Sequence, residues 1–164
     1  RFLADDVRSR HDAMTAALAD AGDARGVRVV FTAHSLPMRI IEAGDPYPDE
    51  LRSTAETVAA ELRLDEGADW MIGWQSAGRT PEPWIGPDIL DVIDELGTDP
   101  EVGGVIVSAC GFVADHLEVL YDLDIEARHR ADDVGLLFDR TACVNDDAAV
   151  MAALATRVIE AADG

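Results

Sequence analysis

Apolar residues along the chain follow two alternating patterns: short continuous runs, and longer stretches with helical spacing. Continuous apolar and β-branched runs of this length predict buried parallel strands. They lie at residues 27–32, 69–74, 102–108 and 135–139. Stretches with apolar side chains three or four positions apart predict helices. They lie at residues 3–21, 49–62, 88–96, 115–133 and 145–162.

Strands that alternate with helices predict a single α/β domain over residues 1–164, with a four-stranded parallel sheet and helices on both faces. The closing helix is expected to turn its apolar side chains inward, namely Val150, Leu154, Val158 and Ile159. The chain starts at Arg1 and a helical pattern follows almost at once. This start favours a processed product or a piece of a longer chain.

Acidic residues dominate the charge of the chain. There are 33 Asp and Glu against 13 basic residues, all of them Arg, for a formal net charge of −20. Such an acidic surface argues against nucleic acid and anionic lipid as partners. No apolar run is long enough to predict a membrane span, and no signal-peptide pattern opens the chain. Cys110 and Cys143 are predicted to be free thiols in a reducing compartment, so we expect a cytoplasmic protein.

A row of acidic residues with helical spacing marks the predicted helix 115–133. Its members are Asp115, Glu118, Asp122, Glu126, His129 and Asp133. On a regular α-helix this spacing places them along one face. Like charges at that spacing repel each other and do not stabilise a helix. The row therefore favours a role in binding cations or transferring protons.

Polar residues also follow the predicted strands, at the point where each strand ends. They are His34, Gln75, the stretch 110–118 and Arg140. The carboxyl ends of parallel strands share one edge of the sheet, so these groups are predicted to line one cleft. His34 could be a hydrogen-bonded structural histidine, a metal ligand or a proton acceptor. Trp74 and Trp84 could fill the core or form a flat wall for a planar ligand.

Five short motifs occur in order along the chain. They read AHSLP at 33–37, GDPYP at 44–48, WQS at 74–76, PWIGP at 83–87 and FVADHLEVLY at 112–121. Together they resemble the C-terminal half of a ferrochelatase, the enzyme that inserts ferrous iron into a porphyrin. The resemblance covers nearly the whole chain. It implies a Rossmann-like chelatase lobe that holds the porphyrin in a cleft against a second lobe.

The resemblance also implies roles for individual residues. His34 and Glu118 would be the catalytic pair, and the metal would meet His34, Glu118, Asp122 and Glu126. The porphyrin would be bound by Ser35, Tyr47, Gln75, Trp84, Phe112 and His116, with Asp115 in support. Metallation needs a base near neutral pH and ligands weak enough to release the metal, and His and Glu meet both needs.

The same resemblance implies the partners. Porphyrin and ferrous iron would be substrates, with no tightly bound cofactor. No iron–sulfur cluster is expected, because the cysteine-rich extension of some members is absent before Gly164. Where the family usually has a proline before Gly111-Phe112, this chain has Cys110. A missing N-terminal lobe, or a second copy of the chain, would complete the cleft.

Two other interpretations stay open on the sequence. One is a half-size chelatase of the sirohydrochlorin type, which acts as a dimer. The other is a lobe that binds metal or porphyrin without catalysis.

Overall fold

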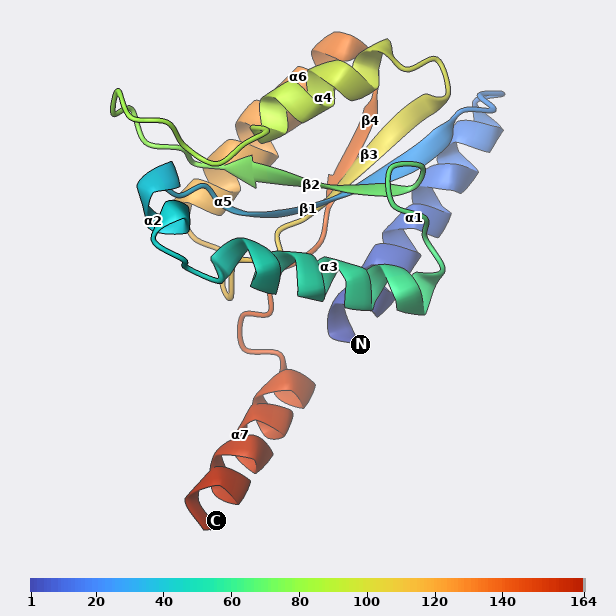
Figure 1. Cartoon of the computed structure of the whole chain (residues 1–164). Coiled ribbons are helices and arrows are strands. Elements are labelled where there is room, and N and C mark those ends of the chain that lie inside the picture. Colours follow the sequence, from blue (N-terminus) through green and yellow to red (C-terminus); the bar gives the residue numbers. More distant parts are fainter. Residues whose placement is uncertain (164) are drawn as a thin grey trace.

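Four parallel strands form the centre of the molecule, in the spatial order β2-β1-β3-β4 (Figure 1). They are β1 (Gly26–His34), β2 (Trp70–Gln75), β3 (Val102–Ser108) and β4 (Leu137–Arg140). The computed structural model describes residues 1–163. Every residue of β3 is buried, as expected for a central strand covered on both faces. The predicted parallel sheet is therefore confirmed.

Helices cover both faces of this sheet, as predicted (Figure 1). On one face, α1 (Phe2–Asp20) and α3 (Tyr47–Leu62) pack against β1 through side chains such as Val7, Val58 and Phe31. On the other face lie α4 (Ile89–Thr98) and a long helix made of three consecutive segments. The segments are α5 (Leu117–Tyr121), the π-helical η1 (Asp122–Ala127) and α6 (Arg128–Val134).

The strand order creates a switch point between β1 and β3. The chain passes from β1 to β2 on one side and then crosses back to place β3 on the other side of β1. In open α/β sheets, ligands bind outside the carboxyl ends of the strands at such a point. Here those ends are His34 and Ser108. The topology therefore places the functional site at the edge where His34 ends β1.

Two element boundaries near this edge differ from the sequence prediction, and one helix was not predicted. β1 runs on to His34, two residues past the predicted end, because Gly73 to Gln75 of β2 pair with it. A short helix that was not predicted, α2 (Met38–Glu42), follows. α3 begins at Tyr47, although Pro48 seemed to forbid it, since proline is tolerated in the first turn of a helix.

The prediction for the last helix was wrong in one respect. α7 (Ala148–Asp163) is a helix, but it extends away from the rest of the molecule (Figure 1). Leu154, Val158 and Ile159 are 53%, 69% and 60% exposed instead of facing inward, and Val150 is only half-buried. Both faces of the sheet are already covered by other helices, so α7 finds no open face of the sheet to pack on within residues 1–163. None of the helices in that part of the chain has the length and apolarity to cross a lipid bilayer.

Candidate functional site

His34 and Glu118 meet at the edge of the sheet, as predicted. Nε2 of His34 lies 3.8 Å from Oε2 of Glu118. Nδ1 of the same ring lies 2.5 Å from the Ser35 carbonyl oxygen. A carbonyl can only accept a hydrogen bond, so Nδ1 carries a hydrogen and the second ring nitrogen, Nε2, is the one that faces Glu118. At 3.8 Å the two atoms are too far apart for a direct hydrogen bond, but close enough for a positive charge on the ring to interact with the carboxylate.

Hydrogen bonds beneath His34 fix the strand ends that carry it. The Thr32 hydroxyl donates to Oε1 of Gln75 at 3.0 Å, and the Ser35 amide donates to the Gln75 carbonyl at 2.7 Å. The Ser35 hydroxyl donates to the Ile85 carbonyl at 2.7 Å and is almost fully buried. Ser35, predicted to contact substrate, therefore holds the loop after β2 against the end of β1.

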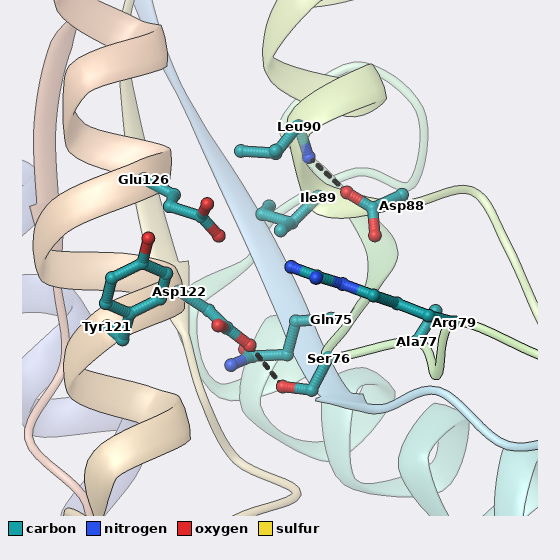
Figure 2. Close-up of a pocket in the computed structure, with 10 residues that line it drawn as sticks. All are labelled: Gln75, Ser76, Ala77, Arg79, Asp88, Ile89, Leu90, Tyr121, Asp122 and Glu126. Carbon is teal, nitrogen blue, oxygen red and sulfur yellow. Dashed lines mark hydrogen bonds between the residues drawn. The ribbon is translucent and has the colours of Figure 1, made fainter.

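Beside this pair lies a pocket of about 360 Å³ (Figure 2). Its ionisable lining consists of Arg79, Asp88, Tyr121, Asp122 and Glu126. The figure shows Asp122 and Glu126 projecting from the long helix toward the loop after β2, with Arg79 between them and Asp88. Three carboxylates against one guanidinium give the pocket lining an excess of negative charge.

One buried amide in this pocket lacks a partner. Gln75 is fully buried, and its Nε2 has no hydrogen-bond partner within residues 1–163. Ser76, next along the chain, adopts a left-handed φ of 61° and its hydroxyl donates to the Asp122 carboxylate. Asp88 accepts from the Leu90 amide as the N-cap of α4, and burial raises the pKa of its carboxyl above 3.8. The polar groups at this end of β2 thus converge on the carboxylates of the long helix.

The acidic row is not the straight stripe that the sequence predicted. Residues 122–127 form a π-helical turn, which holds more residues per turn than an α-helix and changes the face on which later residues lie. Asp122 and Glu126 line the pocket, while His129 and Asp133 are exposed and outside its lining. A π turn has no signature in apolar spacing, so the sequence predicted a regular helix.

Asp115 also departs from that stripe. It precedes α5 and accepts hydrogen bonds from Nη1 of Arg140 at 2.9 Å and from the Asn145 amide at 2.8 Å. The Asn145 bond and the charge of Arg140 lower the pKa of Asp115. Arg140 was predicted to line the cleft, but its guanidinium is engaged with Asp115 and Asp124. Asp115 therefore bonds to Arg140 and Asn145 outside the pocket lining, and its supporting role in the site stays a prediction.

Of the aromatic residues near His34 and Glu118, Phe112 lies beside the His34 ring, whereas Tyr47 packs on Trp74. The Phe112 ring centre is 6.5 Å from that of His34 and 5.3 Å from that of His116, so the three form a short row. Tyr47 packs against Trp74 at 5.8 Å, and burial raises the pKa of the Tyr47 hydroxyl. Trp74 thus belongs to the core.

Trp84 occupies the proline-rich loop. It is half-buried, and its Nε1 donates to the Thr80 hydroxyl at 3.0 Å. The loop is joined to the chain after His34 by a backbone bridge between Pro37 and Trp84. Trp84 therefore stands in the loop that borders the site, where a planar ligand could reach it.

Some site residues were missed from the sequence. Arg79 lies in the proline-rich loop, where no periodicity marks it. Asp88 was expected only as the start of a helix, although an Asp before an apolar helical run is a recognisable N-cap. The four predicted metal ligands also do not form one cluster. In the part of the chain that the structure describes, no group of three or more His, Cys, Asp or Glu side chains is placed to hold a metal ion.

Known proteins resemble this chain over nearly its full length. The Ferrochelatase family model matches residues 5–162. A ferrochelatase of Herpetosiphon aurantiacus is 48% identical over 132 residues, which cover 80% of this chain and 42% of the relative. Coproporphyrin III ferrochelatases of Geobacillus kaustophilus and Bacillus anthracis are each 41% identical over 160 residues, covering 98% of this chain and 48% and 49% of the relatives.

The chain therefore spans about half the length of the curated relatives that it matches. The family match, the parallel sheet and the meeting of His34 with Glu118 at its edge all agree. The chain belongs to the ferrochelatase family.

Proposed function

We propose that this chain is one lobe of a ferrochelatase that inserts ferrous iron into a porphyrin in heme biosynthesis. The observation that carries the proposal is the 3.8 Å approach of His34 Nε2 to the Glu118 carboxylate at the switch point of the sheet. Two pyrrole protons must leave the porphyrin as Fe²⁺ enters. The site supplies a base and a carboxylate at one place, as this reaction requires.

His34 would accept a pyrrole proton at Nε2. Its Nδ1 hydrogen is held by the Ser35 carbonyl, so Nε2 is the free basic nitrogen. Glu118 lies close enough to stabilise the imidazolium that forms. The protonated ring can then pass its proton to the carboxylate or to solvent, because both side chains are partly exposed. His34 and Glu118 therefore form the catalytic pair of the proposal.

Ferrous iron would reach this pair along the carboxylates of the long helix. Glu126, Asp122 and Glu118 follow one another at intervals of four residues, and the first two line the pocket. Carboxylate oxygens bind Fe²⁺ less tightly than thiolates do, so they can release the metal to the macrocycle. Iron is thus a transient substrate in this scheme.

The porphyrin would lie against the apolar residues near the pair. Val113, in the bend before α5, and Leu117, the first residue of α5, are 81% and 79% exposed. They lie close in sequence to Phe112 and His116. Neighbouring exposed apolar side chains offer a contact surface for an apolar macrocycle. Two of the relatives are named coproporphyrin III ferrochelatases, so coproporphyrin III is the first porphyrin to test.

A second lobe would cover the macrocycle from the other side. The relatives are about twice as long as this chain, and the apolar side chains of α5 and α7 are exposed within residues 1–163. We prefer this arrangement to a self-dimerising sirohydrochlorin-type chelatase because the family match and the named relatives are ferrochelatases. Cys110 and Cys143 are free thiols, which suits a cytoplasmic location.

A chimera tests the proposal. Residues 1–164 replace the matching half of the Geobacillus kaustophilus relative, and insertion of Fe²⁺ into coproporphyrin III is followed anaerobically by absorbance. We expect turnover, and a loss of at least about 100-fold in kcat on His34→Ala, since it removes the general base. His129→Ala, an exposed histidine outside the pocket, is the matched control and should leave turnover unchanged. A folded chimera that binds porphyrin but inserts no iron would refute the proposal.

The metal route is tested on the chain itself. Calorimetry with Co²⁺, a stable substitute for Fe²⁺, should show binding that Glu118→Gln and Glu126→Gln each weaken by about tenfold, because each removes a charged oxygen ligand. Asp133→Asn removes an acidic group from the same helix outside the pocket and should have no effect. Equal Co²⁺ affinity in all these proteins would contradict the proposed route.

A further inference from the structure

Arg140 makes an ion pair with the middle of the long helix from the end of β4. Its Nε and Nη2 donate to the two carboxylate oxygens of Asp124 at 2.7 and 2.9 Å, a bidentate arrangement. The arginine side chain is only 13% exposed. Arg140 is itself fixed to the sheet, because it pairs with Val107 of β3. The helix is thus tied to the central sheet.

The same guanidinium also holds the entrance to this helix. Its Nη1 donates to Oδ1 of Asp115 at 2.9 Å and to the Thr141 carbonyl at 3.1 Å. Asn145 completes the group, donating its side-chain amide to Asp115 and accepting from the Asp115 backbone amide. Arg140, Asp124, Asp115 and Asn145 are called the Arg140 cluster below. The Arg140 guanidinium therefore bonds to one aspartate before Glu118 in the sequence, Asp115, and to one after it, Asp124.

The position of Asp124 links the cluster to the pocket. Asp124 lies midway between Asp122 and Glu126, and residues two apart on a helix point to nearly opposite sides. Asp122 and Glu126 face the pocket (Figure 2). Asp124 lies outside the pocket lining and pairs with Arg140 of β4. Fixing Asp124 from behind therefore fixes the direction of both pocket carboxylates.

The π-helical turn makes this tie necessary. Such turns are rare and less favoured than α-helix, so tertiary contacts must hold them. Over residues 1–163, the side chains of η1 form hydrogen bonds to two partners, Ser76 and Arg140. Ser76 belongs to the exposed loop after β2, and Arg140 to the sheet. Only the bond to Arg140 is bidentate and reaches a residue within a strand.

We propose that Arg140 is a positioning residue for metal delivery, which holds the η1 turn through Asp124 and Asp115 so that Glu118, Asp122 and Glu126 point along one path. This inference rests on the proposed function for its consequence in catalysis. Arg140 touches neither the pocket nor His34, so it acts only through the carboxylates that it anchors.

Arg10 offers a matched control on the other side of β4. It also bridges two aspartates, donating to Asp6 at 2.8 Å and to Asp139 at 2.7 Å, with a side chain 29% exposed. Loss of either arginine removes a two-carboxylate ion pair beside β4. Only Arg140 is tied to η1, so only its loss should affect the metal path.

The experiment compares Arg140→Gln, Arg140→Lys, Asp124→Asn and Arg10→Gln in the 164-residue chain. Co²⁺ affinity is measured by calorimetry, and the Co²⁺ absorption spectrum reports the ligand geometry. Arg140→Gln and Asp124→Asn should each weaken Co²⁺ binding by about tenfold, and the double variant should be no weaker than either, because both break the same bond. Arg140→Lys keeps the charge without the bidentate bond and should recover part of the affinity.

Hydrogen exchange gives an independent reading. Amides of residues 117–127 should exchange about tenfold faster in Arg140→Gln than in the parent, while Arg10→Gln leaves them unchanged. If the parent binds no Co²⁺, the proposed metal route is refuted. The role of Arg140 in holding η1 is then judged from the hydrogen exchange of residues 117–127 alone. If Arg140→Gln and Arg10→Gln change exchange at 117–127 or Co²⁺ affinity equally, the positioning role is refuted.

Discussion

The long helix of α5, η1 and α6 and the terminal helix α7 have similar apolar spacing but opposite surroundings. In the long helix, Val119, Leu123, Ala127 and Ala131 are fully buried against the sheet and α4. In α7, Leu154, Val158 and Ile159 remain exposed. Both patterns predict an amphipathic helix, and only one helix finds an apolar partner within residues 1–163. Periodicity therefore specifies which face of a helix is apolar, and the tertiary structure decides what covers it.

The site is built on the packed helix. Glu118, Asp122 and Glu126 occupy the polar positions of a helix whose opposite side is fixed in the core, so their directions are restrained. No group of the site lies on α7. The contrast between the two helices can be tested in four ways.

Truncation of leucine should give the largest difference. Leu123→Ala in η1 removes a fully buried side chain and should lower the free energy of unfolding by about 3 kcal/mol. Leu154→Ala in α7 truncates a side chain that is 53% exposed and should cost no more than about 0.5 kcal/mol. Urea denaturation followed by circular dichroism measures both. Similar losses would show that α7 packs on the domain in solution.

Added volume should have a smaller but still clear effect. A methyl group at Gly97 of α4 would lie 2.6 Å from Cβ of Val134 in α6, so Gly97→Ala forces these two helices apart. We expect a loss of about 2 kcal/mol in the free energy of unfolding. Ala152→Val adds volume on α7, where the residue is exposed, and should cost about 0.5 kcal/mol from helix propensity alone. Thermal unfolding of the two variants tests the difference.

The pH dependence of stability should identify the contribution of Asp115. Its pKa in the folded protein is lowered below 3.8, so its contribution is complete above that pH and is lost as the pH falls through the lowered value. Asp115→Asn should therefore cost about 1 kcal/mol at pH 6, and the difference from the parent should shrink below pH 3.8. The exposed Asp133→Asn is the control. If the difference in the free energy of unfolding between Asp115→Asn and the parent stays the same at low pH, the stabilisation does not come from the ionised carboxylate of Asp115.

Deletion of α7 should have the smallest effect on the domain. Removing residues 148–164 should change the free energy of unfolding by about 0.5 kcal/mol or less, because no residue of α7 is buried. It should, however, remove the apolar surface proposed to meet a second lobe. Sedimentation velocity of the parent and the deletion with the complementary half of the Geobacillus kaustophilus relative distinguishes the two effects. Equal association with that half would mean that α7 is not part of the contact.

Much of the active edge could be predicted from the sequence. The apolar run at residues 27–32, just before His34, predicts a buried parallel strand. The rule for parallel sheets places the end of that strand beside the start of the helix that carries Glu118. The resemblance carried by the five motifs then singled out His34 and Glu118 among the polar residues predicted at this edge. The structure confirms that the two side chains meet, at 3.8 Å.

The partners of the supporting residues could not be predicted. Arg140 follows a strand just as His34 does, yet its guanidinium pairs with Asp124 and Asp115 behind the helix instead of opening into the pocket. Arg79 enters the pocket from a loop without periodicity. In each case the direction of a long side chain depends on charges that are distant in sequence.

The sequence by itself determined the order of strands and helices, the parallel sheet and the residue types at its functional edge, because these follow from local apolar spacing and short motifs. The tertiary structure alone decided the π-helical turn, the pairing of Arg140 and the exposure of α7. Each of these depends on contacts between segments far apart in the chain, and local spacing carries no information about such contacts.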